Sequence, residues 1–404
     1  MISKDFLKAG HAPTLLSAFL YFDMSFMVWV ILGALSVQIA KDLGLSPAEK
    51  GLMVAVPILA GAGLRLVNGV LVDHIGPKKT GLIAQVIVIA GLLLAWLLHI
   101  DSYAAVLTLG GVLGMAGASF AVALPLASRW YPPKYQGIAL GIAGAGNSGT
   151  VFASLFAPTL AKMFGWQAVF GLAAIPLAIV FVVYLWLAKD SPEQPPAKTT
   201  AQYARILKEP DAWWFMLFYG VTFGGFVGLS SSLNIYFNSE YGLNPIVAGF
   251  FTAACVFVGS LLRPVGGSVA DRIGGIRTLS IMYSVAGIAL VVLSFKARSV
   301  YVTLAILMTA MGALGMGNGA VFQLVPQRFR TEMGIMTGLV GMFGGVGGFY
   351  LAATLGFSKQ ATGSYQMGLI GFAILALVAL GGLSFIKKKW RTTWGALSAN
   401  QVKI

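Results

Sequence analysis

Twelve hydrophobic stretches divide this 404-residue chain, and each is long enough to cross a lipid bilayer as a helix. Hydrophobic residues make up 58% of the chain and charged residues only 10%, which excludes a soluble enzyme, a disordered chain and a nucleic-acid-binding domain. We therefore predict an all-α membrane protein with twelve transmembrane helices. The spans are expected at roughly 13–40, 48–73, 79–99, 103–129, 137–162, 166–188, 211–237, 246–271, 277–295, 300–325, 333–358 and 364–386.

The basic residues between the spans predict an orientation. The net charge is +14, and most Lys and Arg residues fall in alternate loops and near the two ends of the chain. The other loops hold only Lys41, Lys50, Lys162, Lys296, Arg298 and Lys359. Cytoplasmic loops carry the excess of Lys and Arg. We therefore expect a multi-pass protein of the cell membrane with both termini in the cytoplasm, and the charge requires no nucleic-acid partner.

The longest polar segment lies at the middle of the chain, at 189–210, and contains Pro192 and Pro195. Polar segments rich in proline are typical of linkers. We expect residues 1–188 to form an N-terminal six-helix bundle and this segment to be a cytoplasmic linker. Residues 211–404 would then form a C-terminal six-helix bundle with a cytoplasmic tail.

The two halves of the sequence repeat at an offset of 198 residues, so that segment 64–76 matches segment 262–274. The matched pairs are Arg65 with Arg263, Gly69 with Gly267, and Asp73 with Asp271. Because a repeat of six spans is even, both copies share one orientation, and a pseudo-two-fold axis along the membrane normal relates them.

Charged side chains inside membrane spans are costly and indicate function by default. Three lie deep in the predicted spans, namely Asp23, Arg65 and Arg263. Each arginine precedes the aspartate of its repeat by eight residues. That spacing places the arginines about 12 Å into the membrane at matching depth. Two cations that face each other repel, and a small anion between them would relieve the repulsion.

Arginine suits a planar oxyanion because its flat fork donates paired hydrogen bonds. The alternative is that each arginine pairs with a carboxylate or with helix carbonyls, but only one deep acid exists for the two. The residues by themselves indicate a small monovalent anion. They do not separate nitrate from nitrite, chloride or formate.

Glycine strips mark the fifth and eleventh spans. The fifth contains Gly137, Gly141, Gly144, Gly146 and Gly149, with Asn147 among them, and the eleventh contains Gly334, Gly338, Gly341, Gly344, Gly345, Gly347 and Gly348. Such strips allow helices to pack closely and to slide. Plain helix packing is the alternative interpretation.

These motifs resemble a known family. The pattern Gly-x-x-x-Asp-(Arg/His)-x-Gly-x-(Arg/Lys), after the second and again after the eighth span, resembles the signature of the major facilitator superfamily. With the arginines and the glycine strips, the sequence closely resembles the nitrate/nitrite porter family of that superfamily. Further matches lie at 117–120, 219–224 and 317–322. The resemblance covers the whole chain and implies alternating access, by rocking of two six-helix bundles around a central site.

The resemblance also implies a role for individual side chains. Arg65 and Arg263 would clamp the oxygens of nitrate or nitrite, and Asn147 and Tyr219 would donate further hydrogen bonds. The rings of Phe120 and Phe223 would enclose the flat anion from both sides. The implied hinges are Gly141, Gly144, Gly146, Gly338, Gly341 and Gly344. Without the family motif, a hydrogen bond between helices would equally explain Asn147 and Tyr219. Packing in the core or against lipid would explain Phe120 and Phe223.

Asp23 lies about ten residues into the first span, close in depth to Arg65. One interpretation is a structural salt bridge to Arg65 or a hydrogen bond to Ser25. The other is a carboxylate that loads and unloads a proton and so couples anion uptake to the proton gradient. Segment 21–29 looks more like the proton-symport branch of the family, whereas an obligatory anion exchanger needs no such acid.

The repeated loops are expected to latch the cytoplasmic side in the outward-facing state, through contacts between the bundles. The latch residues are Gly69, Asp73, Gly267, Asp271 and Arg272. The first copy departs from the superfamily pattern because His74 stands in the place of the usual Arg, which weakens the expected latch on that side and leaves substrate choice untouched.

We therefore predict a secondary transporter that imports nitrate, and also nitrite, with protons as the coupling ion. The alternatives are a nitrate/nitrite antiporter or a transporter of another small monovalent anion. A channel, a sensor and a membrane enzyme fit less well, because the deep polar residues cluster at one level and the loops are short. We expect no metal or cofactor, no nucleic-acid partner, and a monomer in the lipid bilayer.

Overall fold

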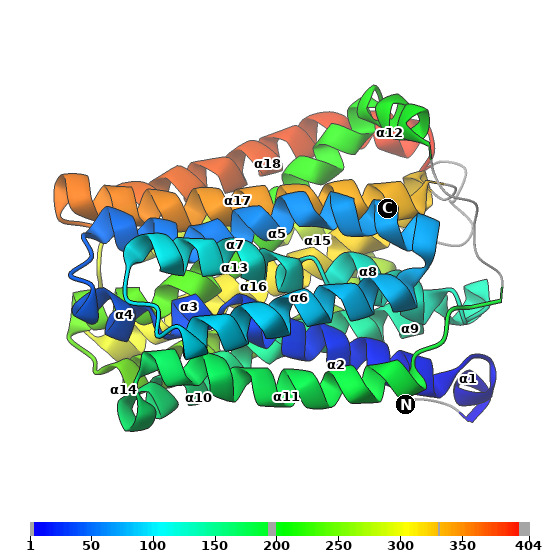
Figure 1. Cartoon of the computed structure of the whole chain (residues 1–404). Helices are drawn as coiled ribbons and strands as arrows, with labels where there is room; N and C mark the ends of the chain where they lie inside the picture. The colour runs from blue at the N-terminus through cyan, green and yellow to red at the C-terminus, as the bar shows by residue number, and fades with distance from the viewer. Residues whose placement is uncertain (1–3, 193–198, 330–331, 396–404) are drawn as a thin grey trace.

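The computed structural model describes residues 4–192, 199–329 and 332–395, and every regular element in those ranges is helical. This part of the chain contains twelve helical segments that are long and apolar enough to cross a membrane. They run side by side along the length of an elongated bundle (Figure 1). The prediction of an all-α protein with twelve spans is confirmed.

The first half of the chain supplies spans one to six. Its helices are α1 (Lys4–Lys8), α2 (Ala12–Trp29), α3 (Ile31–Ala34), α4 (Ser36–Asp42), α5 (Pro47–Ile75), α6 (Pro77–Leu97), α7 (Tyr103–Gly117), α8 (Phe120–Ser128), α9 (Pro133–Gly144), the 3-10 turn η1 (Ala145–Ser148), α10 (Gly149–Phe164) and α11 (Trp166–Leu187). Three spans are interrupted: the first comprises α2 to α4, the fourth α7 and α8, and the fifth α9, η1 and α10. The break at η1 lies within the predicted glycine strip, where the helix is intrinsically least stable.

The second half supplies spans seven to twelve. Its helices are α12 (Thr200–Leu207), α13 (Pro210–Tyr241), α14 (Pro245–Ile273), α15 (Gly275–Ser294), α16 (Val300–Arg328), α17 (Met333–Thr362) and α18 (Gln366–Thr392). The predicted linker contains α12, which begins with a capping box between Thr199 and Gln202. The prolines at 195 and 196 lie outside the described residues. Helix α18 continues past the predicted end at 386 because Lys and Arg side chains are favourable in the last turn of a helix.

The internal repeat is visible in the backbone. Helices α5 and α14 each contain 29 residues, each begins at a proline, and each ends one residue before a glycine. The two glycines, Gly76 and Gly274, have φ angles of 86° and 96°. An L side chain rarely adopts such angles, so glycine at these positions permits the sharp turns into α6 and α15.

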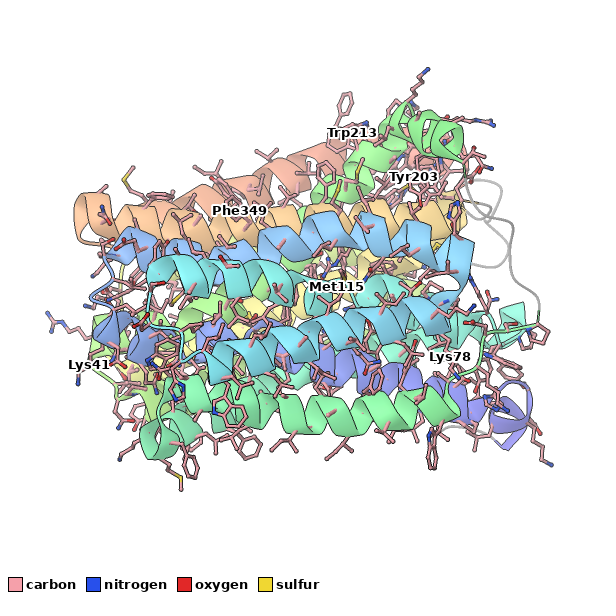
Figure 2. All side chains as sticks on the ribbon, in the orientation of Figure 1. Lys41, Lys78, Met115, Tyr203, Trp213 and Phe349 are labelled. Carbon is pink, nitrogen blue, oxygen red and sulfur yellow. The ribbon has the colours of Figure 1, made fainter. Side chains whose placement is uncertain are left out.

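The two ends of the bundle carry different loops. We call the end near Lys78 the basic end and the end near Lys41 the opposite end (Figure 2). Helices α1 and α12 and the last turns of α18 lie at the basic end (Figure 1). The basic end carries the turns at 76, 129–132, 188–192, 208–209 and 274, and the opposite end those at 43–46, 98–102, 165, 242–244, 295–299 and 363–365.

The two halves pack against each other toward the opposite end. Gly51 of α5 meets Gly356 of α17 so closely that a methyl group on Gly51 would lie 2.8 Å from the Cα atom of Gly356. The side-chain amide of Asn234 on α13 donates a hydrogen bond of 2.5 Å to the carbonyl oxygen of Ala34 on α3. Helix α10 likewise contacts α14. Close approach of small residues is the usual way in which membrane helices associate.

The halves separate toward the basic end. On α17, Gly345 packs against Ala62 of α5, but the space that a side chain would fill at Gly338 and Gly334 is empty within 4 Å. All three glycines lie on one face of the helix, since their spacing follows its turns. At Gly144 of α9, too, the space that a side chain would fill is empty within 4 Å. The centre of the molecule is therefore closed toward the opposite end and opens toward the basic end.

Candidate functional site

The two repeated arginines reach the middle of the bundle from different halves. Arg65 projects from α5 and is almost fully buried, with 1% of its surface exposed. Arg263 projects from α14 and is partly exposed. The difference follows from the separation of the halves, because Arg263 lies where the bundle opens toward the basic end.

Backbone oxygens hold Arg65, and no ion pair joins it to a carboxylate of the described residues. Its Nε atom donates to the carbonyl oxygen of Gly117 at 3.1 Å, and Nη1 donates to the carbonyl oxygen of Gly341 on the other half of the molecule. Its Nη2 atom is buried and has no hydrogen-bond partner in the described part of the chain. An unpaired buried donor costs about 1–3 kcal/mol, so this guanidinium has a free donor for a ligand.

Arg263 is held by two of the predicted site residues. Nη1 donates to Oδ1 of Asn147 at 3.2 Å, and Nη2 donates to the hydroxyl oxygen of Tyr219 at 3.3 Å. Asn147 belongs to η1 in the other half of the molecule, and its buried Nδ2 donor has no partner within residues 4–192, 199–329 and 332–395. A hydrogen bond between helices, the alternative that the sequence left open for Asn147, is therefore present, and Nδ2 remains as a second donor beside the cation.

Aromatic rings enclose both guanidinium groups. The ring of Phe120 lies 5.6 Å from Cζ of Arg65 and 5.9 Å from Cζ of Arg263, so it adjoins both cations. Phe223 lies 5.0 Å from Cζ of Arg65 and stacks on Tyr219, with ring centroids 5.1 Å apart and an interplanar angle of 4°. The structure thus brings together all six side chains for which the sequence predicted a binding role.

Two further aromatic residues belong to this cluster although the sequence assigned them no role. Phe322 of α16 lies 5.9 Å from Cζ of Arg263 and 5.0 Å from the ring of Tyr219. Trp29 lies 5.4 Å from Cζ of Arg65 and donates from its indole nitrogen to the carbonyl oxygen of Pro57 at 2.8 Å. Both lie in segments that resembled the family, and only the packing shows that their rings face the cations.

The six predicted hinge glycines fall into two groups. Gly141, Gly144 and Gly338 adjoin empty space, and they lie on the side of the site toward the basic end. Gly146 packs against the ring of Phe22, while Gly341 and Gly344 pack against the site. The glycine strips therefore run from closely packed contacts at the level of the arginines into the region where the halves separate.

Asp23 has a partner that the sequence did not identify. Its Oδ1 atom accepts a hydrogen bond of 2.7 Å from the hydroxyl of Ser148, the last residue of η1. Within the described residues, no ion pair joins Asp23 to an arginine, and no hydrogen bond joins its side chain to Ser25. Neither structural partner considered from the sequence is used, because α2 packs its Asp23 face against η1.

The predicted latch residues are not joined across the halves in this conformation. Asp73 forms an ion pair of 3.1 Å with Arg129, which belongs to the same half. Asp271 and Arg272 are exposed. This arrangement fits a state in which the two halves are apart at the basic end, and a latch between them stays a prediction for the other state.

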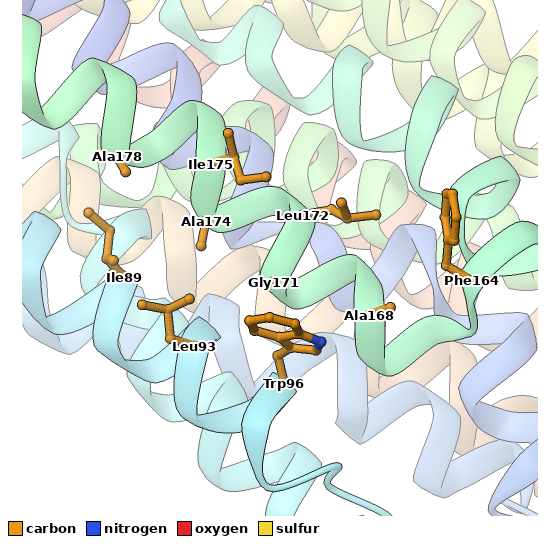
Figure 3. A pocket seen from close by; sticks show the side chains of 10 residues that line it. All are labelled: Ile89, Leu93, Trp96, Phe164, Ala168, Gly171, Leu172, Ala174, Ile175 and Ala178. Carbon is orange, nitrogen blue, oxygen red and sulfur yellow. The ribbon is translucent and has the colours of Figure 1, made fainter.

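A separate cavity of about 350 Å³ lies between α6 and α11, near the end of α10 (Figure 3). Apolar residues line it, among them Leu93, Trp96 and Ile175, and no charged side chain does. Because it contains no cation and lies outside the arginine cluster, it cannot replace the central site as a place for an anion.

Comparison with known proteins supports the interpretation of the fold and the motifs. Residues 17–352 match the family described as Major Facilitator Superfamily. The chain is 33% identical to a protein of Bacillus subtilis named "Nitrite extrusion protein", with 90% of each chain covered. It is also 33% identical to the "Probable nitrate/nitrite transporter NarK2" of Mycobacterium tuberculosis, covering 92% of this chain and 95% of that one.

The fold also has solved relatives. A crystal structure of a bacterial homologue of the human lysosomal transporter Spinster superimposes with a TM-score of 0.72 at 17% identity. The match covers 93% of this chain and 96% of that chain. At this level of identity the likeness concerns the fold alone.

Proposed function

Because this chain belongs to the nitrate/nitrite porter family of the major facilitator superfamily, we propose that it carries nitrate, and also nitrite, across the cell membrane by alternating access. The proposed direction is import, and the proposed coupling ion is the proton. One observation carries the substrate class: two guanidinium groups meet one cluster of aromatic rings, with unpaired buried donors beside them.

The unpaired donors favour an anion as the ligand. Nη2 of Arg65 and Nδ2 of Asn147 have no acceptor among the residues that the structure describes, although buried polar groups in proteins are nearly always hydrogen-bonded. An anion between the arginines would supply acceptors and would offset the repulsion of the two cations. Flat anions with oxygen atoms suit this site better than a spherical halide, because a guanidinium donates paired bonds in one plane.

The distribution of basic loops supports an inward-open assignment for this conformation. Cytoplasmic loops carry the excess of Lys and Arg, so we assign the basic end, with both chain termini, to the cytoplasm. The site would then release its anion into the cell. Transport would require the bundles at 1–188 and 211–404 to rock so that the basic end closes and the opposite end opens.

Asp23 is the proposed proton carrier. Two arginines with one monovalent anion keep a net positive charge, and an acid nearby can balance that charge as it exchanges a proton. The alternative is nitrate/nitrite exchange, in which the empty two-arginine site resists reorientation. The relative from Bacillus subtilis is named for extrusion, so direction and coupling have to be measured together.

Nitrate uptake by purified protein in liposomes tests the proposal. One set of vesicles carries an inward proton gradient and no internal anion, and the other carries internal nitrite and no gradient. We expect uptake in the first set. Uptake in the second set alone would establish exchange, and no nitrate movement in either set would overturn the proposed substrate.

Competition in the same vesicles tests the alternative substrates. Nitrite should reduce nitrate uptake, because it presents oxygens in the same plane. Chloride at equal concentration should not, because it cannot accept two parallel hydrogen bonds from one guanidinium. Stronger inhibition by chloride than by nitrite would contradict the planar clamp.

A further inference from the structure

The 3-10 turn η1 lies between two parts of the fifth span that have different surroundings. Toward the opposite end, α10 packs against α14 of the other half. Toward the basic end, Gly141 and Gly144 of α9 adjoin empty space. Closing the basic end requires α9 to move while α10 leaves its partner, so η1 is placed where the span must bend.

Helix α2 holds η1 through Asp23 and its neighbour. Gly146 lies against the ring of Phe22, and Gly149 lies against the backbone carbonyl of Asp23, with no room for a side chain at either glycine. The Ser148 hydroxyl donates to Asp23 Oδ1 at 2.7 Å. Backbone packing and one side-chain hydrogen bond thus fasten the turn to Asp23.

The same turn carries a residue of the anion site. Asn147 directly precedes Ser148, and its side-chain oxygen accepts a hydrogen bond from Arg263. A short path therefore runs from the Asp23 carboxyl group, through Ser148 and Asn147, to a cation on the other half of the molecule. Each step is one hydrogen bond or one peptide unit.

Few other ionisable groups surround Asp23. On the elements that pack against α2, Tyr103 lies near an end of α7, Arg129 directly follows α8, Lys134 and Tyr135 lie near an end of α9, and Lys162 lies near an end of α10. Tyr184 of α11 packs against Tyr21, with ring centroids 5.1 Å apart and an interplanar angle of 52°. Within the part of the chain that the structure describes, no ion pair reaches Asp23 from any of these elements or from Arg65. Protonation of this acid would therefore remove a negative charge that no ion pair within the described residues neutralises.

We infer that Ser148 is a positioning residue through which the protonation of Asp23 controls the bend at η1 and the placement of Asn147. This inference rests on the proposed proton-coupled transport. A carboxylate accepts stronger hydrogen bonds than a neutral acid. When the basic end is closed, a proton taken from external water weakens the bond from Ser148 and lets the span bend at η1 as the basic end opens. Release of the proton to cytoplasmic water ionises Asp23, which then fastens η1 in the conformation described here.

The test replaces Ser148 with alanine and measures nitrate uptake into liposomes as a function of external pH. Losing a hydrogen bond to a charged group changes an equilibrium by about tenfold or more. We therefore expect the rise in uptake between pH 8 and pH 6 to shrink by about tenfold or more in Ser148→Ala. Nitrate/nitrite exchange without a gradient should persist, which would show that the variant is folded.

Two variants control the interpretation. Ser154→Ala removes a buried hydroxyl of α10 that bonds only within its own helix, to the carbonyl oxygen of Thr150 at 3.1 Å, and it should keep the wild-type pH profile. Ser148→Thr retains a hydroxyl and should restore the pH dependence. A wild-type pH profile in Ser148→Ala, with exchange intact, would overturn the role of Ser148. Absence of proton-driven uptake in the wild-type protein would instead overturn the proposed coupling, and this inference with it.

Discussion

At the scale of single residues, the repeat places two arginines in equivalent positions but gives them different partners. Arg65 is buried and bonds to the backbone oxygens of Gly117 and Gly341. Arg263 is partly exposed and bonds to the side chains of Asn147 and Tyr219. The site is therefore asymmetric: one cation is held by the scaffold, and the other is held by side chains that can rearrange around a ligand.

Replacing either Arg65 or Arg263 with lysine should severely weaken nitrate uptake. Lysine keeps the charge and loses the planar fork. The loss of one hydrogen bond to a charged group costs about 1.5–3 kcal/mol, or about a tenfold or greater loss of transport. Initial uptake rates in liposomes measure the effect, with Arg298→Lys in the exposed loop as the matched control. Wild-type uptake by either site variant would exclude the two-arginine clamp.

Replacing Asp23 with asparagine should remove the pH dependence of uptake while nitrate/nitrite exchange continues. In the wild-type protein, lower external pH protonates the carboxyl group from outside, so uptake into vesicles held at neutral pH should rise as external pH falls. Asparagine cannot take up the proton, and its profile should be flat. The control is Asp101→Asn in a loop of the opposite end. An unchanged profile in Asp23→Asn would return this acid to a structural role.

At the scale of helices, glycine decides which parts of the bundle can approach each other. Gly51 and Gly356 bring α5 and α17 into close contact toward the opposite end. Gly338, farther along the same helix, adjoins empty space toward the basic end. If the bundles rock, the region around Gly338 must close while the region around Gly51 and Gly356 opens. Either region can close only if no side chain lies between its helices.

Leucine at these glycines should therefore trap opposite states. Gly338→Leu fits this conformation and should hold the basic end open, whereas Gly356→Leu should wedge the opposite end apart. Spin labels at exposed Lys79 and Arg277, changed to cysteine, report the opening of the basic end, since the native Cys255 is buried. We expect a long label distance in Gly338→Leu and a shorter one in Gly356→Leu. Equal distances in the two variants would contradict alternating closure about these strips.

At the scale of the whole molecule, the loops with most of the basic residues share one end of the bundle, with α1 and the last turns of α18 (Figure 1). The predicted orientation therefore assigns this whole end of the bundle to the cytoplasm. We expect a fluorescent protein fused to the C-terminus to fluoresce in the cytoplasm. Alkaline phosphatase inserted at 242–244 should be active outside the cytoplasm. The reverse pair of results would place the basic end outside and turn the inward-open assignment around.

Several properties of this protein could be predicted from sequence because they depend on one segment at a time. Hydropathy predicts where each span lies. The excess of Lys and Arg in alternate loops predicts which loops lie at the same end of the bundle. The repeat pairs Arg65 with Arg263 by register alone. The six residues with a predicted binding role received that role through the family resemblance, and the structure brings their side chains together.

Other features depend on contacts between distant segments, and only the tertiary structure decided them. Ser148 lies 125 residues from its partner Asp23, and the direction of a side chain from its helix is set by packing. The same reason explains why Phe322 and Trp29 entered the cluster unpredicted. The sequence by itself determined twelve spans, a repeat and a cationic centre, because hydrophobicity and charge act locally. The packing of the two halves decided which end is open and which oxygens hold Arg65. It also decided which turn Asp23 fastens.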